Sequence, residues 1–177
     1  MRVSRAYKTA DRRKTRSGSA GRGSNAPMAP RELAYRYLAL RDRSEKELRD
    51  YFGRKEIPGD VADAVLEEFK NSGYIDDRRF AASYAKSLIE RKGLSRYALA
   101  MELKRKGVRQ DYIDGALDGL FSEGGCDEDG IAVALAQKKA ASMRNLPEDK
   151  AKRRLTDYLR RRGFSFDTIK KALKALI

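Results

Sequence analysis

The sequence predicts an all-α protein, built as three tandem three-helix repeats in an elongated, curved array that follows a disordered basic tail. Apolar residues recur at spacings of three and four, and serine, proline and glycine interrupt them at helix-length intervals. A common pattern also recurs along the chain, which indicates a repeat architecture. The expected segments are the tail 1–29, repeat 1 at 30–73, repeat 2 at 74–122, and a loop with repeat 3 at 123–177.

The tail is rich in arginine, serine and glycine. It carries eight positive side chains against one acid, Asp11, a net charge of +7 and half of the formal +14. Because it has almost no large apolar residues, burial cannot offset the entropy lost on ordering, and we expect disorder. Two roles stay open for it, a basic arm on nucleic acid and an inert solubilising segment.

Repeat 1 begins with a helix after Pro30. Ser44 and Glu47 form a capping-box pattern that predicts a second helix, and Pro58 suits the first turn of a third. The predicted inward residues of the three helices are Leu33, Tyr37, Leu40, Leu48, Tyr51, Phe52, Val61, Val65, Leu66 and Phe69.

Repeats 2 and 3 carry the same kinds of signal. Asp76 or Asp77 caps the first helix of repeat 2, Ser95 caps the second, and Gly93 and Gly107 end them. In repeat 3 the helices follow an acidic, glycine-rich loop, a proline and a final glycine. The predicted inward residues include Phe80, Tyr84, Leu88, Leu99, Leu103, Ile113, Leu117, Leu135, Leu155, Leu159, Ile169 and Leu173.

The repeat is visible in the strings 102–108 and 158–164. Each has an apolar anchor, three basic residues, a glycine and another apolar residue. The glycines, Gly107 and Gly163, permit the positive φ at which one helix ends before the next begins. Repeat 1 departs from the pattern because Glu56 stands at the glycine position. Each unit is marginal alone and gains by packing on its neighbours, which favours an array.

Composition narrows the possible functions. The pI of about 10.0 is typical of proteins that contact nucleic acid or acidic partners. Histidine is absent, and the single cysteine, Cys126, stands beside acids that disfavour a reactive thiolate. No nucleophile–base pair, metal-ligand cluster or phosphate-binding glycine loop is evident, so we expect no enzyme activity, no metal and no cofactor. No signal peptide or membrane-length apolar run is present, and we expect a cytoplasmic location.

Three strings resemble the RecX family of RecA modulators. They are the run 41–48 that opens the second helix, the glycine-apolar-apolar-Asp-Asp run 73–81, and the arginine-glycine-phenylalanine run 161–169. Each string is weak alone, but the ordered set is specific, and the similarity extends from about Glu32 to Leu176. The basic tail lies outside it.

The resemblance implies a regulatory protein without catalytic residues. Its expected partner is the RecA filament, with single-stranded DNA as part of that filament, and its expected effect is mainly to inhibit RecA recombinase and ATPase activity. It also implies a role in homologous recombination, DNA repair and the SOS response. We expect a monomer.

Basic residues at equivalent positions of two repeats form a hypothetical binding stripe. Helix geometry places them away from the apolar face, toward phosphates or an acidic protein surface. An ordinary solvated face is about equally consistent with the pattern. The candidate residues are Lys104, Arg105, Arg153, Arg160 and Arg161.

Two further functions stay open beside the RecA modulator. A direct DNA-binding regulator of helix-turn-helix type would need one recognition helix with polar base-reading residues and usually a dimer. A scaffold that binds only proteins would use a concave face of the array. The three similar units and the dispersed basic residues argue against the first of these.

Overall fold

The computed structural model describes residues 28–122 and 125–176, and over these ranges the chain forms nine α-helices and no β-strand. The all-α fold predicted from the sequence is therefore confirmed. The tail predicted at 1–29 lies almost entirely outside the described residues.

Each repeat contains three helices, and the breaks between them fall at the residues predicted to begin or end a helix. Repeat 1 comprises α1 (Pro30–Ala39), α2 (Glu45–Arg54) and α3 (Gly59–Asn71). Repeat 2 comprises α4 (Asp77–Lys92), α5 (Arg96–Arg105) and α6 (Gln110–Phe121). Repeat 3 comprises α7 (Glu128–Ala141), α8 (Glu148–Arg160) and α9 (Phe166–Lys174).

Each repeat encloses a hydrophobic core of its own. The helix pairs that pack extensively all lie within a repeat, among them α4 with α6 and α7 with α9. Units this small bury a modest share of their surface, so contacts with the neighbouring repeat add needed stability. Side chains buried at the three centres include Leu48, Phe52 and Phe69, then Leu88, Leu99 and Leu103, then Leu159 and Ile169.

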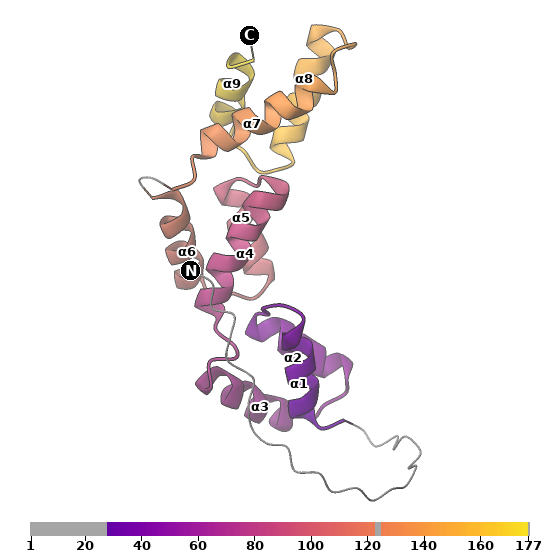
Figure 1. Cartoon of the computed structure of the whole chain (residues 1–177), viewed down its shortest axis with the longest axis vertical. Coiled ribbons are helices and arrows are strands. Elements are labelled where there is room, and N and C mark those ends of the chain that lie inside the picture. The colour runs from indigo at the N-terminus through magenta and orange to yellow at the C-terminus, as the bar shows by residue number, and fades with distance from the viewer. Residues whose placement is uncertain (1–27, 123–124, 177) are drawn as a thin grey trace, which may run out of the picture.

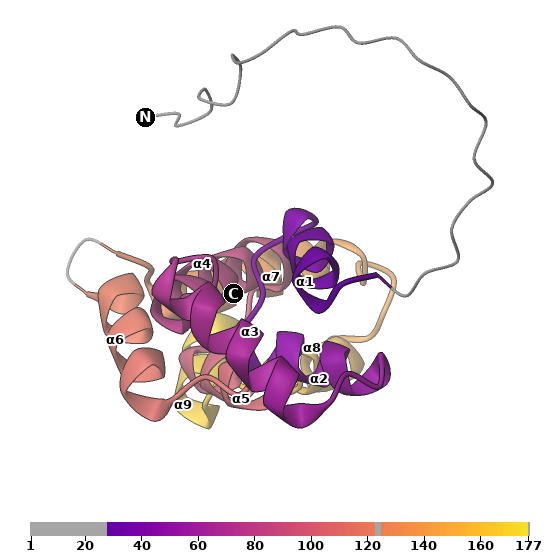
Figure 2. The same cartoon turned by 90° about the horizontal axis from the view of Figure 1, so that it is seen from below.

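The repeats follow one another along the long axis in an elongated, gently curved array (Figure 1). Repeat 1 and repeat 3 lie at opposite ends, with repeat 2 between them. Viewed along the axis, the second helices α2, α5 and α8 gather on one side, and the first helices α1, α4 and α7 lie on the other (Figure 2). The predicted elongated arrangement is therefore confirmed.

The predicted caps and turns are present. The Ser44 hydroxyl accepts from the Glu47 amide in a complete capping box, and Asp76 and Ser95 cap α4 and α5. Gly107 and Gly163 have φ of 79° and 86°, as their positions in the repeat require. Glu56 has φ of 55°, so repeat 1 makes the same left-handed turn without a glycine.

Two residues predicted to face inward are exposed. Leu40 lies beyond the end of α1 with 79% of its surface exposed, and Val61 in α3 is 38% exposed. Ala62, the residue next to Val61, is buried instead. Leu40 follows Ala39, the last residue of α1, so it does not continue the inner face on which Leu33 and Tyr37 lie. Apolar spacing alone determines neither the rotation nor the end of a helix.

Candidate partner-binding surface

Neighbouring repeats meet end to end through their second helices. Joint 1 is the contact of the α2 N-terminus with the C-terminal end of α5, where the Ser44 hydroxyl donates to the Lys106 carbonyl at 2.7 Å. Joint 2 is the contact of the α5 N-terminus with the end of α8, where the Ser95 amide donates to the Arg162 carbonyl at 3.0 Å. Both serines are fully buried. Each joint sets the positive end of one helix dipole against the negative end of another, which is favourable.

A second hydrogen bond recurs at both joints. At joint 1 the Glu45 amide donates to an Asp77 carboxylate oxygen at 2.9 Å, and at joint 2 the Arg96 amide donates to a Glu128 carboxylate oxygen at 3.3 Å. In each case the acid lies at the start of the first helix of one repeat, and the amide lies at the start of the second helix of the preceding repeat. Burial raises the pKa of Asp77, partly offset by the hydrogen bond from the Glu45 amide. The two joints therefore share one backbone geometry.

Joint 1 adds a cluster of charged side chains. The Glu47 carboxylate accepts from the Arg41 guanidinium at 2.8 Å and from the Lys106 ammonium at 2.6 Å. Burial of the carboxyl raises its pKa, but the hydrogen bonds and charges of the two cations outweigh burial and lower the pKa of Glu47 to about 2. The Glu47 side chain is only 13% exposed, so this cluster ties repeat 1 to repeat 2 through a partly dehydrated ion pair.

Joint 2 uses a stacked arginine in place of that cluster. Ala98 and Lys92 stand where joint 1 has Glu47 and Arg41, so joint 2 has no acid at this position. The Arg162 guanidinium donates to the Lys92 carbonyl at 2.9 Å and lies over the Tyr158 ring at 3.8 Å from its centroid. Gly163 approaches so closely that an added Cβ would lie 2.8 Å from the Ala98 Cβ.

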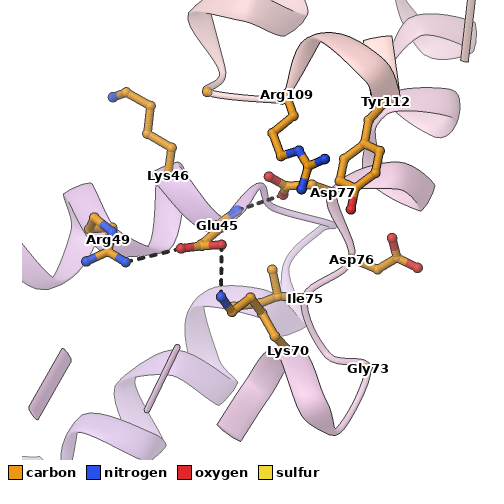
Figure 3. A pocket seen from close by; sticks show the side chains of 11 residues that line it. Glu45, Lys46, Arg49, Lys70, Gly73, Ile75, Asp76, Asp77, Arg109 and Tyr112 are labelled. Atoms are coloured by element: carbon orange, nitrogen blue, oxygen red, sulfur yellow. Dashed lines mark hydrogen bonds and ion pairs between the residues drawn. The ribbon is translucent and has the colours of Figure 1, made fainter. Parts of the chain in front are cut away.

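Grooves with different charges flank joint 1. The largest has a volume of about 590 Å³ and mixes acids with cations, as Figure 3 shows for Glu45, Asp77, Lys70 and Arg109. Its Glu45 and Lys70 are already paired with each other at 3.4 Å. Two other grooves, of about 200 and 520 Å³, share Lys106 and hold more cations than acids. These two grooves therefore attract an anionic partner more strongly than the mixed groove does.

The five predicted stripe residues are all exposed. Lys104 and Arg160 each lie three residues before the glycine of a joint, so the structure places them at equivalent points of neighbouring repeats. Arg105 lines the groove of about 200 Å³ and pairs with Glu102 at 2.6 Å. Among the described residues the other four, Lys104, Arg153, Arg160 and Arg161, form no ion pair. Their role in binding stays a prediction.

Sequence reasoning did not identify the joint residues. Lys106 and Arg162 each directly precede a repeat glycine, and this shared position is the one feature of the sequence that could have identified them as joint residues. Glu47 was interpreted as a capping residue, which it is, but its reach across to Lys106 depends on how two repeats pack. No residue spacing within one repeat reports such a contact.

Neither a metal site nor a membrane span emerges from residues 28–122 and 125–176. No group of three or more histidine, cysteine, aspartate or glutamate side chains is placed to hold a metal ion there. No helix in this part of the chain is both long and apolar enough to cross a membrane.

Family models match all three repeats in order. The first, second and third three-helix domains of RecX match residues 31–69, 76–117 and 127–173. The chain belongs to the RecX family. Regulatory protein RecX of Thermobifida fusca (strain YX) is 37% identical over 154 residues, which cover 85% of this chain and 81% of the relative. Regulatory protein RecX of Mycobacterium marinum (strain ATCC BAA-535 / M) is 42% identical over 139 residues, 76% of this chain and 77% of the relative.

Solved RecX structures share the fold. The crystal structure of RecX from Lactobacillus salivarius superposes with a TM-score of 0.68 at 21% identity, covering 83% of this chain and 94% of that one. A second RecX crystal structure gives a TM-score of 0.67 at 24% identity, over 80% of this chain and 68% of the other. The RecX relatives are named regulatory proteins and not enzymes, which supports a regulatory role for this chain.

Proposed function

We propose that this protein binds the RecA–single-stranded DNA filament and inhibits the recombinase and ATPase activities of RecA. The observation that supports this proposal most strongly is the elongated RecX array. Its repeats join end to end and present cations along the outside. A filament is a long repeating partner, and an extended array of similar units contacts such a partner at several points.

Charge supports the same partner. The filament combines DNA phosphates with protein surface, and the formal charge of +14 favours approach to polyanions. The predicted stripe is proposed as the contact region, with the cationic grooves beside Lys106 as its continuation at joint 1. The binding residues proposed are Lys104, Arg105, Arg153, Arg160 and Arg161.

The test is RecA ATP turnover on single-stranded DNA, titrated with this protein below one copy per RecA monomer and at two salt concentrations. We expect inhibition well below stoichiometry, because one bound copy blocks growth or turnover along several protomers. No inhibition at any ratio, together with salt-sensitive binding to bare DNA, would favour a direct DNA-binding regulator instead.

The stripe is tested separately by reversing two of its charges. The variant Arg153→Glu/Arg160→Glu is expected to need a higher concentration for the same inhibition. Lys86→Glu/Lys170→Glu makes the same change in net charge at exposed residues outside the stripe and serves as the matched control. Equal inhibition by the two variants would remove the stripe from the proposal and leave the filament as partner.

A further inference from the structure

The loop between α7 and α8 encloses a groove of about 530 Å³ at the end of the array. The corresponding connections are residues 40–44 in repeat 1 and 93–95 in repeat 2, whereas here the connection is residues 142–147. The loop is held in place: Met143 is 9% exposed, and its amide donates to the Ala140 carbonyl at 2.8 Å. The Leu146 amide in turn donates to the Met143 carbonyl at 2.9 Å. The loop therefore has a defined shape, and it is the longest of the three connections between a first and a second helix.

Three cations line this groove without a carboxylate. Lys139 comes from α7, Arg144 from the loop and Arg154 from α8, and Ser142 and Asn145 add polar groups. Within the described part of the chain none of the three cations forms an ion pair. Four other grooves in the described part of the chain, three beside joint 1 and one between α6 and α7, each contain at least one acid.

Unneutralised cations around one hollow repel each other and cost stability, unless an anion relieves the repulsion. Arginine offers a planar pair of donors that matches phosphate oxygens, and lysine adds a point charge. We propose that this groove binds the phosphate backbone of single-stranded nucleic acid. A single strand can bend its phosphates into a concave site, whereas a duplex presents them on a stiff, convex surface. The site acts without RecA and therefore goes beyond the function proposed above.

The test compares two triple variants with equal net charge. The groove variant is Lys139→Gln/Arg144→Gln/Arg154→Gln, and the control is Lys86→Gln/Lys170→Gln/Lys174→Gln, at exposed residues that line none of the five grooves. Fluorescence anisotropy of a labelled oligothymidylate measures the binding constant of the full chain across a range of sodium chloride concentrations. Far-UV circular dichroism checks that the helices are intact, and Arg144→Gln alone gives a milder second variant.

Each phosphate contact contributes about 0.7 to the slope of log affinity against log salt for a single strand, so loss of three contacts should reduce the slope by roughly 2. We expect that reduction in the groove variant, a smaller one in Arg144→Gln and little change in the control. Equal losses in both triple variants would overturn the proposal, because binding would then follow net charge alone. A second result would also overturn it: pyrophosphate shifts the amide resonances of loop residues 142–147, but oligothymidylate binds both triple variants equally. The groove would then bind a free phosphate anion and not a nucleic acid strand. Since the assay contains no RecA, its outcome is independent of the ATP-turnover test.

Discussion

The two joints of the array use one backbone geometry with two chemistries. Joint 1 is held by Glu47 between Arg41 and Lys106, whereas joint 2 places Arg162 on a tyrosine ring and on a backbone carbonyl. Joint 1 therefore adds an ionised carboxylate to the close packing at Gly107, whereas joint 2 combines close packing at Gly163 with a stacked arginine. A repeat can keep its shape while the side chains that stabilise its junctions change, because the serine caps and helix ends supply the alignment.

The free end of the array explains the departure at Glu56. Gly107 and Gly163 lie at the same turn in repeats 2 and 3, and a neighbouring repeat packs against each of them. Within residues 28–122 and 125–176 no repeat packs against the turn at Glu56, and the Glu56 side chain is exposed. A side chain is tolerated there despite its positive φ, while the two joints exclude one for steric reasons as well.

The largest expected effects are from a methyl group placed at the glycine of either joint. Gly163→Ala adds a Cβ 2.6 Å from the Ser95 hydroxyl oxygen and 2.8 Å from the Ala98 Cβ, at φ of 86°. Backbone strain and overpacking together should lower the free energy of unfolding by about 3 kcal/mol. Gly107→Ala at joint 1 places its Cβ 2.5 Å from the Lys46 Cβ, whose position the backbone fixes, and should cost about as much. Urea unfolding followed by circular dichroism measures both, and a loss below about 1 kcal/mol in either variant would contradict steric exclusion at that joint.

Removing the charge of Glu47 tests joint 1. Glu47→Gln keeps a capping-box residue but leaves Arg41 and Lys106 without their acid, and we expect a loss of about 2 kcal/mol at pH 7 after allowance for solvent screening. The folded state lowers the pKa of Glu47 from its ordinary 4.5 to about 2. Its contribution is therefore complete above about pH 4.5 and disappears as the pH falls through about 2.

The measurement is the difference in unfolding free energy between the wild type and Glu47→Gln, taken at several pH values from 7 downward. The difference should shrink below pH 4.5, since protonation of the wild type reproduces the variant. A difference that stayed constant with pH would show that the ion pair does not stabilise joint 1.

A gain in stability is expected from a substitution at Glu56. Glu56→Gly removes the cost of a left-handed side-chain residue and should raise the free energy of unfolding by roughly 1 kcal/mol, reduced by the greater flexibility of glycine in the unfolded chain. Thermal melting of the variant beside the wild type measures it. A lower melting temperature would mean that Glu56 makes a stabilising contact that outweighs its strain.

The smallest effect expected is that of salt. Joint 1 contains charges and joint 2 relies on packing, so raising sodium chloride should narrow the gap between the wild type and Glu47→Gln by a few tenths of a kcal/mol. The pair is only partly exposed, which limits the screening. A gap that widened with salt would argue against an electrostatic origin.

The sequence by itself determined the helices, their caps and the threefold repeat. These features depend on residues that are close together in the sequence, such as Ser44 and Glu47 or the string before Gly107. The spacing of such residues can be read directly from the sequence. The family resemblance followed from the same strings, and the array followed from repeats too small to be stable alone.

Only the tertiary structure decided which charges meet. Glu47 and Lys106 are 59 residues apart, and Lys139 and Arg154 reach one groove because a loop folds between two helices. The burial of Ala62 beside an exposed Val61 has the same origin, since the rotation of a helix is fixed by what packs against it. Contacts between separate elements depend on the packing of the whole repeat, which local spacing does not encode.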